Sequence, residues 1–257
     1  MRVDLNSDLG ESFGAWKMGD DEAMLGIITS ASIACGWHAG DPVVMHRAAE
    51  LAKANDVAIG AHPSFNDLWG FGRRVIRGTS MGDLEKMIAY QIGALQAIAA
   101  TVGHKVTHVK AHGALGNLVN DETEFAMAMG RALKAVDPSL VYVVMPGRPS
   151  VAAAERLGLP MLREIFADRA YQDNSQLVMR GTPGAVIHDA GAAAERILRA
   201  LDEKAIISIS GTRVPVDIDS ICVHGDTPTA VEMARQLRQR LEHAGVEIKR
   251  YTASLGT

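Results

Sequence analysis

Hydrophobic and polar positions along the chain follow two periods, one typical of strands and one typical of helices. Short apolar and β-branched runs predict strands at 2–8, 31–35, 57–61, 106–111, 140–145, 161–166, 205–210 and 219–224, with a last strand-like run at 246–251. Apolar residues spaced three and four apart predict helices at 20–28, 42–54, 82–102, 121–136, 149–157, 188–202 and 227–244. Strands and helices therefore alternate along nearly the whole chain.

Residues at the ends of these segments support the helix boundaries. Asp41 followed by Pro42 fits an N-cap with proline at the first helical position. Gly103 stands where a glycine is expected after a helix. The run 226–228, Asp-Thr-Pro, gives a further start signal before the last helix.

The alternation favours a mostly parallel sheet with right-handed crossovers. We expect an irregular β/α barrel, similar to a TIM barrel, with seven or eight mostly parallel strands in a single domain spanning 1–257. The link 211–218 is too short for a helical crossover, so the barrel is expected to be irregular there, with a hairpin. A doubly wound open sheet is the alternative fold.

Composition narrows the class of protein. Of the 257 residues 47% are hydrophobic, which is enough for a full core. The formal net charge of −4 argues against general binding to nucleic acid or to anionic lipid, which needs surplus Lys and Arg. The chain has no signal-like start and no long apolar span, so a cytoplasmic protein without a membrane segment is expected. Cys35 and Cys222 are interpreted as free thiols, with a nucleophilic Cys35 as the minor alternative.

Polar residues gather at, or just after, the carboxyl ends of the predicted strands. They are Asp4, Asn6, Asp8, Glu11, His38, His62, Lys110, His112, Glu164, Asp168, Arg169, His224 and Asp226. The opposite strand ends carry ordinary turn residues such as Asn55 and Asp56. Because the carboxyl ends of barrel strands meet at one mouth, the sequence predicts an active site there.

Three polar residues of the first strand are expected to share one face. Asp4, Asn6 and Asp8 alternate with apolar or small residues, and a strand places every second side chain on the same side. If this face is buried, Lys110 or a nearby Arg must supply partners. Crowded carboxylates would raise the pKa of at least one of them, which suits acid–base catalysis.

Histidines and arginines add two further expectations. His38, His62, His112 and His224 each follow a different strand, which suggests acid–base catalysis or a metal site. The sequence has no HExxH motif and no close His pair with a third ligand nearby, so a tight catalytic metal is the minor reading. The glycine-rich run 70–74, which includes two arginines, suits contact with phosphate or carboxylate. Walker and GxGxxG motifs are absent from the sequence.

Several longer runs resemble the LamB/YcsF family, in the right order and over essentially the whole chain. They are DLNSDLGESFG at 4–14, ACGWHAGDP at 34–42, GAHP at 60–63, GFGRR at 70–74, YQIGAL at 90–95, VKAHGAL at 109–115, EIFADRAY at 164–171 and CVHGD at 222–226. The chain departs from the family at Ser7, where Cys is usual, and at Ala111 and Gly116, where Pro and Tyr are usual. The pair Lys110 and His112 is kept.

The resemblance implies a β/α barrel that hydrolyses 5-oxo-L-proline (pyroglutamate) to L-glutamate, coupled to hydrolysis of ATP to ADP and phosphate. It also implies two partner subunits, B and C, and Mg²⁺ arriving with ATP, for which Asp4 and Asp8 are candidate ligands. Assembly with further copies of this chain is left open. The alternatives are a stand-alone metal-dependent deacetylase or glycosidase, and a non-catalytic partner that binds oxoproline or scaffolds the other subunits.

Such a reaction assigns expected roles to the predicted mouth. Asp8, Glu11 or His62 is the candidate base, and His38, His112 and His224 are candidate proton donors. Lys110, Arg73 and Arg74 are the expected anion contacts. Glu164, Asp168 and Arg169 are expected to form an ion-pair network that orients the rim, and the last two join Asn6 and Asp226 as candidate binders of substrate or phosphate.

Overall fold

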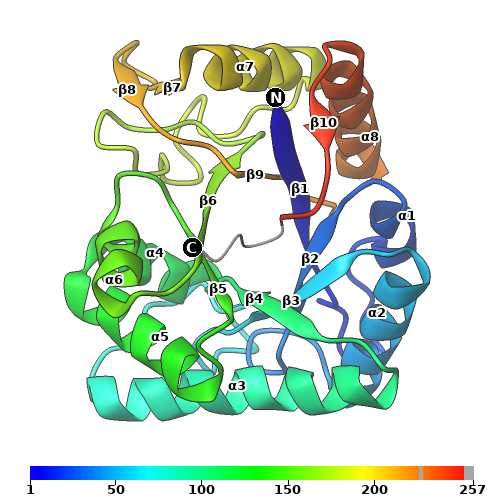
Figure 1. The fold of residues 1–257 in the computed structure, drawn as a ribbon, viewed down its shortest axis with the longest axis vertical. Helices are drawn as coiled ribbons and strands as arrows, with labels where there is room; N and C mark the ends of the chain where they lie inside the picture. The colour runs from blue at the N-terminus through cyan, green and yellow to red at the C-terminus, as the bar shows by residue number, and fades with distance from the viewer. Residues whose placement is uncertain (226–227, 252–257) are drawn as a thin grey trace.

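The computed structural model of the protein describes residues 1–225 and 228–251 of the 257. Within these ranges, seven parallel strands lie side by side in sequence order and close into a barrel (Figure 1). They are β1 (Arg2–Leu9), β2 (Ser30–Ala34), β3 (Ala58–His62), β4 (Val106–Val109), β5 (Val141–Val144), β6 (Met161–Phe166) and β9 (Ser220–Cys222). The barrel closes because β9 pairs with both β6 and β1. The predicted barrel is confirmed, and the open-sheet alternative is wrong.

The barrel is irregular at the link where the sequence predicted irregularity. Strands β7 (Ala205–Ile207) and β8 (Arg213–Pro215) pair only with each other, as an antiparallel hairpin. The hairpin prediction is confirmed, but 205–210 is not a barrel strand, because so short a link can only fold the chain back on itself. Of the run 246–251, β10 (Glu247–Ile248) pairs in parallel with the start of β1.

Eight helices in the described ranges surround the strands (Figure 1). They are α1 (Asp21–Leu25), α2 (Pro42–Ala54), α3 (Met81–Thr101), α4 (Gly113–Asp121), α5 (Thr123–Val136), α6 (Pro149–Leu157), α7 (Ala190–Glu203) and α8 (Pro228–His243). Asp41 caps α2 by accepting hydrogen bonds from the backbone N–H groups of Val43 and Val44, as predicted. The predicted start signal at 226–227 lies outside the described residues.

The predicted helix 121–136 corresponds to α5, and a second helix that was not predicted, α4, lies directly before it. Glu122 has extended dihedral angles (φ −120°, ψ 121°) and separates α4 from α5. The sequence pattern does not predict α4, because this helix contains Gly113 and Gly116 and glycine is a poor helix former. This missed helix begins directly after His112, so it fixes the backbone that carries one of the candidate site residues.

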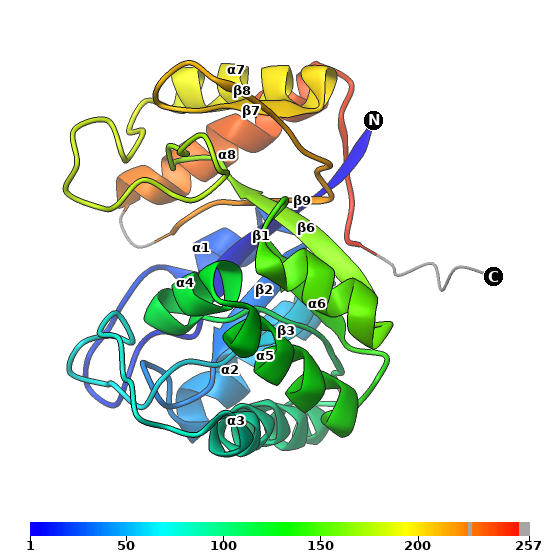
Figure 2. The same cartoon turned by 90° about the vertical axis from the view of Figure 1, so that its left-hand side faces the viewer.

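All barrel strands are parallel, so their carboxyl ends open at one mouth. Figure 2 shows the loops that follow β1, β3 and β6 on the side opposite the N-terminus. These loops cover 10–20, 63–80 and 167–189. None of the helices in the described part of the chain combines the length and the hydrophobicity that a membrane crossing requires.

Gly60 on β3 leaves room for the side chain of its register partner on β4, His108. A Cβ at position 60 would lie 2.2 Å from Cδ2 of His108. We expect Gly60→Ala to lower the free energy of unfolding by about 1–3 kcal/mol, because the overpacked ring must move. The measurement is urea unfolding followed by circular dichroism.

The matched control for this substitution is Gly93→Ala in α3. An added Cβ at position 93 meets no atom within 4 Å. Because alanine favours a helix interior over glycine, this variant should be more stable by about 0.5–1 kcal/mol. Equal effects of the two substitutions would contradict the packing described for Gly60.

Candidate active site

A cavity of about 650 Å³ opens at the mouth of the barrel. Its wall includes seven of the eight residues predicted to be catalytic, which are Asp8, Glu11, His62, Lys110, His112, Glu164 and His224. The eighth, His38, is buried directly behind the ring of His112, with 3.6 Å between the ring centroids. The structure therefore brings together side chains that lie far apart in the sequence.

Lys110 forms the centre of the buried polar group in this cavity. Its Nζ lies 2.9 Å from Oδ1 of Asp8, 2.9 Å from Oε1 of Glu164 and 3.3 Å from Sγ of Cys222. Burial disfavours the ammonium, but attraction to the two carboxylates outweighs it and holds the pKa of Lys110 well above its usual value. Since the ammonium donates to Asp8 and Cys222 and lies in ion-pair contact with Glu164, Lys110 holds the two carboxylates together, which the geometry favours over the expected anion contact.

The carboxylates beside Lys110 have pKa values shifted in opposite directions. Burial raises the pKa of Asp8, but the charges of His62 and Lys110 outweigh it and lower that pKa well below its usual value. For Glu164, burial dominates over Lys110, so its pKa is raised. Asp8 is thus ionised at the cavity wall, and Glu164 binds a proton more readily. Two carboxylates with separated pKa values are a common arrangement for acid–base catalysis.

Asp4 lies below the cavity and does not reach it. Its carboxylate accepts hydrogen bonds from the hydroxyls of Thr29, Ser30 and Ser220, at 2.5 to 2.8 Å. Burial raises its pKa despite these bonds. Both carboxylate oxygens accept hydrogen bonds from hydroxyls, an environment that does not favour the expected role of Asp4 as a ligand of Mg²⁺. Asn6 likewise donates to Ser220 inside the barrel, at 2.7 Å.

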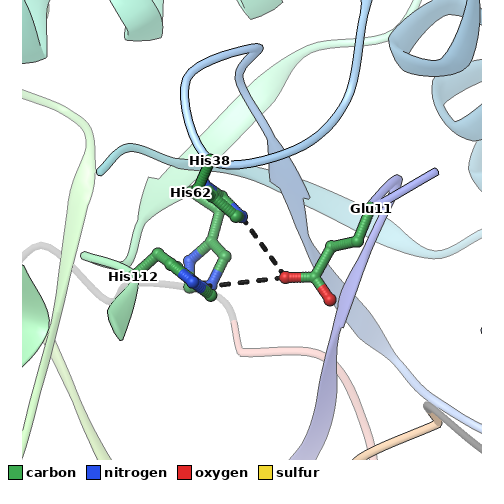
Figure 3. A group of neighbouring side chains, drawn as sticks. All are labelled: Glu11, His38, His62 and His112. Atoms are coloured by element: carbon green, nitrogen blue, oxygen red, sulfur yellow. Dashed lines mark hydrogen bonds and ion pairs between the residues drawn. The ribbon is translucent and has the colours of Figure 1, made fainter. Parts of the chain in front are cut away.

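Three of the four predicted histidines form one group with Glu11 (Figure 3). The rings of His38 and His112 stack with 6° between their planes. Oε1 of Glu11 lies 3.3 Å from Nε2 of His38 and 3.7 Å from Nδ1 of His112. Nε2 of His62 lies 3.0 Å from Nδ1 of His112. Burial, with repulsion from neighbouring histidines, lowers the pKa of His38 well below its usual value and that of His112 to about 3.

The fourth histidine, His224, lies with a different carboxylate. Its Nδ1 is 2.7 Å from Oδ2 of Asp168. Burial raises the pKa of Asp168, but the bond to His224 outweighs it and lowers that pKa. The ring of Phe166 stacks on His224 and also lies 5.1 Å from Nζ of Lys110. The sequence offered no signal for this role of Phe166, because an apolar residue in a strand is normally core.

The predicted network of Glu164, Asp168 and Arg169 has different partners from those expected. Glu164 contacts Lys110, and Asp168 contacts His224. Nη2 of Arg169 donates to the carbonyl oxygen of Val178 at 2.7 Å, within the loop after β6. This loop determines where Arg169 lies, and the sequence pattern does not predict the path of the loop.

Guanidinium groups give the outer part of the cavity a positive charge. Arg73 and Arg169 line it as predicted, together with Arg148 and Arg180, which the sequence analysis missed. Burial lowers the pKa of Arg169, with repulsion from Arg180 and Arg73 adding to the effect, so these charges lie near one another. Arg74 instead donates through Nε to Oδ1 of Asp67 at 2.8 Å, and it is not part of the cavity wall. Asp226 lies outside the described residues.

Both cysteines are free and buried, as expected for unpaired thiols. Burial raises the pKa of Cys35 to about 12, and it also raises that of Cys222 well above its usual value. A thiol with so high a pKa carries about one part in 10⁴ of thiolate at pH 8, so the nucleophilic alternative for Cys35 is unsupported.

We therefore expect neither thiol to react with iodoacetamide in the native protein over an hour at pH 8, and both to react after unfolding in guanidinium chloride. Intact mass spectrometry counts the added groups. Rapid labelling of one thiol in the native state would show that the barrel interior opens to solvent, contrary to the burial described here.

Comparison with known proteins supplies a family and a fold. A model of the LamB/YcsF family matches residues 3–256. The chain is 54% identical over 248 residues to a Rhodopseudomonas palustris protein named as the A subunit of 5-oxoprolinase, covering 96% of this chain and 98% of that protein. It is 43% identical to the lactam utilization protein from Thermus thermophilus, whose crystal structure has a TM-score of 0.92 and a coverage of 98% and 100%.

A more distant structure shares the fold alone. The catalytic domain of a peptidoglycan N-acetylglucosamine deacetylase from Eubacterium rectale has a TM-score of 0.53 at 8% identity, covering 100% of this chain and 90% of that domain. At this identity the likeness concerns the barrel and not the chemistry at its mouth.

Proposed function

Because the chain belongs to the LamB/YcsF family, we propose that it is a subunit of a 5-oxoprolinase and opens the ring of 5-oxo-L-proline to give L-glutamate. The observation that carries the proposal is the ammonium of Lys110 between Asp8 and Glu164, whose pKa values are shifted in opposite directions. The name of the R. palustris relative supports the substrate.

The proposed reaction is coupled to ATP and completed by partner subunits. A lactam amide is a poor electrophile, and transfer of a phosphoryl group from ATP·Mg²⁺ to its oxygen activates the ring carbonyl carbon. Subunits B and C are the proposed partners. The R. palustris relative is named as the A subunit of its enzyme, and this name supports the need for other subunits. The products are L-glutamate, ADP and phosphate.

Asp8 is the proposed base for ring opening. It is ionised, and 15% of its side chain is exposed toward the cavity, so it is accessible to a water molecule. Water loses a proton to Asp8 and adds to the activated carbon. The C–N bond then breaks, His224 protonates the leaving nitrogen, and a second water hydrolyses the resulting acyl phosphate. Asp168 orients His224, and Lys110 holds Asp8 in place.

The arginines at the outer cavity are the proposed clamp for the carboxylate or phosphoryl group of the substrate. Arg169 is 7% exposed and anchored to the Val178 carbonyl, so its remaining N–H groups are held in a fixed direction. We expect Arg169→Lys to raise KM for 5-oxoproline by about 10- to 100-fold with a smaller change in kcat, because a charge-assisted hydrogen bond contributes about 1.5–3 kcal/mol. Steady-state kinetics of the assembled enzyme measures the split, and an unchanged KM would remove Arg169 from the clamp.

The alternative of a stand-alone deacetylase or glycosidase rests on the fold alone. The two readings are separated by assaying this chain with 5-oxoproline plus ATP·Mg²⁺ and subunits B and C, and separately with N-acetylglucosamine oligomers without ATP. We expect one glutamate and one ADP per oxoproline consumed in the first assay, and no acetate in the second. Acetate release by the chain alone would overturn the proposal. A non-catalytic partner would leave the rate unchanged when Asp8 is replaced.

A further inference from the structure

The histidine–carboxylate group beside the cavity has the dimensions of a metal site. Glu11 follows β1, His38 follows β2, His62 ends β3 and His112 follows β4, and each offers one ligand atom within 4.8 Å of the others. Tetrahedral coordination with metal–ligand bonds of about 2.0–2.1 Å places ligand atoms about 3.3 Å apart. Three of the separations in this group, at 3.0, 3.3 and 3.7 Å, lie on either side of this value.

The hydrogen bonds of two rings require a cation at their facing nitrogens. Nδ1 of His62 lies 2.7 Å from the carbonyl oxygen of Lys110, and Nε2 of His112 lies 2.8 Å from that of Phe71. Because a carbonyl oxygen can only accept, both of these nitrogens carry hydrogen. If both rings are neutral, Nε2 of His62 and Nδ1 of His112 then carry no hydrogen, and their lone pairs face each other with 3.0 Å between the two nitrogens. Either a metal ion or a proton must relieve their repulsion, and a proton on Nε2 of His62 would also face Oδ2 of Asp8, 3.4 Å away.

The outer hydrogen bonds of the two rings favour the metal over the proton. Histidines that bind metals usually donate their other N–H to a carbonyl or carboxylate, which is the arrangement of His62 and His112.

The backbone holds the rings in place before any ion binds. Gly72 has φ +63°, and a Cβ there would lie 2.7 Å from Cδ2 of His112 and 2.8 Å from Cβ of His38. The glycine-rich loop, which the sequence suggested as an anion contact, thus packs its backbone against the two stacked rings. A rigid set of nitrogens loses little entropy when a metal binds.

We propose that Glu11, His62 and His112, with His38 as the weakest ligand, bind one divalent transition-metal ion of the zinc type at the wall of the cavity. Imidazole and carboxylate ligands suit Zn²⁺ among the divalent ions. Within the described residues Nδ1 of His38 is buried without a hydrogen-bond partner, so this ring lacks the outer acceptor of the other two. Glu11, His62 and His112 line the cavity, so the ion would be accessible to substrate.

A second group of potential ligand atoms lies close together in Asp8, Cys222 and His224, but it does not fit a metal ion. The ammonium of Lys110 already lies 2.9 Å from Asp8 and 3.3 Å from Cys222. A metal ion there would be repelled by a fixed positive charge. Substitutions in the first group are therefore expected to weaken metal binding, and substitutions in the second group are not.

The test is Zn²⁺ binding by this full chain alone, after removal of metals with a chelator, in competition with a chromophoric chelator at pH 7.5. We expect one tight Zn²⁺ per chain, and an affinity about 100-fold or more lower in Glu11→Gln and in His62→Gln. His224→Gln, in the rejected group, and His46→Gln, on the exposed face of α2, should bind as the wild type does. Replacement by Co²⁺ adds an absorption spectrum that reports the ligand geometry.

Binding no tighter in the wild type than in His62→Gln would overturn the proposal and leave a shared proton between His62 and His112. Loss of binding in His224→Gln with retention in Glu11→Gln would do so as well. Thermal melts show that each variant is folded, and Glu11→Gln, whose side chain is at the cavity wall, keeps the test valid if a buried histidine variant unfolds. Since no substrate or partner subunit is present, failure here is independent of the proposed function.

Discussion

Replacing Lys110 with methionine is expected to lower the free energy of unfolding by about 3–5 kcal/mol at pH 8, because it leaves two buried carboxylates without their shared cation. The loss should shrink as the pH falls toward about 5. Without Lys110, burial and mutual repulsion raise the pKa values of Asp8 and Glu164 in the folded state. The folded variant then binds more protons than the unfolded chain, and its stability falls as the pH rises through that window.

In the wild type, the contribution of Asp8 to stability depends on pH in the opposite direction. Its folded-state pKa is lowered, so its contribution to stability is fully present above the unfolded pKa of about 3.9 and is lost only as the pH falls through the folded value. Urea unfolding at pH 8, 6.5 and 5 measures how the free energy of unfolding changes with pH in the variant and in the wild type. Lys105→Met removes an exposed lysine five residues earlier in the chain. It should change the free energy of unfolding by less than about 0.5 kcal/mol at all three pH values. An equal loss at every pH in Lys110→Met would contradict the paired arrangement.

Replacing Asp8 with asparagine is expected to reduce kcat of the assembled enzyme by about 10²- to 10⁴-fold, the usual contribution of a positioned base. The amide oxygen can still accept a hydrogen bond from Lys110, while the side chain can no longer take a proton from water. Lys110 also retains its contact with Glu164, so the barrel should stay folded. Glutamate release from 5-oxoproline, followed at saturating ATP, measures the change.

The control for this substitution is Asp202→Asn, which makes the same chemical change on the exposed face of α7 and should leave kcat within about twofold. A variant at Asp8 with normal melting behaviour and more than a tenth of wild-type kcat would remove the role of base from Asp8. Because Asp8 is ionised far below neutral pH, its titration should not limit turnover between about pH 5 and 8.

Local rules predicted the parts of the fold that depend on neighbouring residues. The start of α2 follows from Asp41 and Pro42, and the convergence of polar residues follows from parallel strands that share one mouth. The short link 211–218 could be identified as irregular, but a count of strand-like runs could not show that 205–207 leaves the barrel. That outcome depends on β9 closing the barrel by pairing with both β6 and β1, which is a contact between distant segments.

The site was predictable in its members but not in their pairing. Asp4 and Asp8 share one face of β1, yet three hydroxyls surround one and an ammonium holds the other. Arg73 and Arg74 are adjacent in sequence, yet Asp67 binds only the second and removes it from the cavity wall. Arg180 carries no motif at all, and only the path of the loop after β6 brings it to the cavity. Such differences arise from tertiary contacts, which single-sequence patterns do not encode.

The decisive experiment measures glutamate release from 5-oxoproline by this chain alone, by subunits B and C alone, and by all three together, each with and without ATP·Mg²⁺. We expect glutamate only from the complete mixture with ATP, accompanied by ADP. Glutamate from this chain alone without ATP would contradict the coupled mechanism. Glutamate from subunits B and C without this chain would show that the mouth of this barrel does not perform the ring opening.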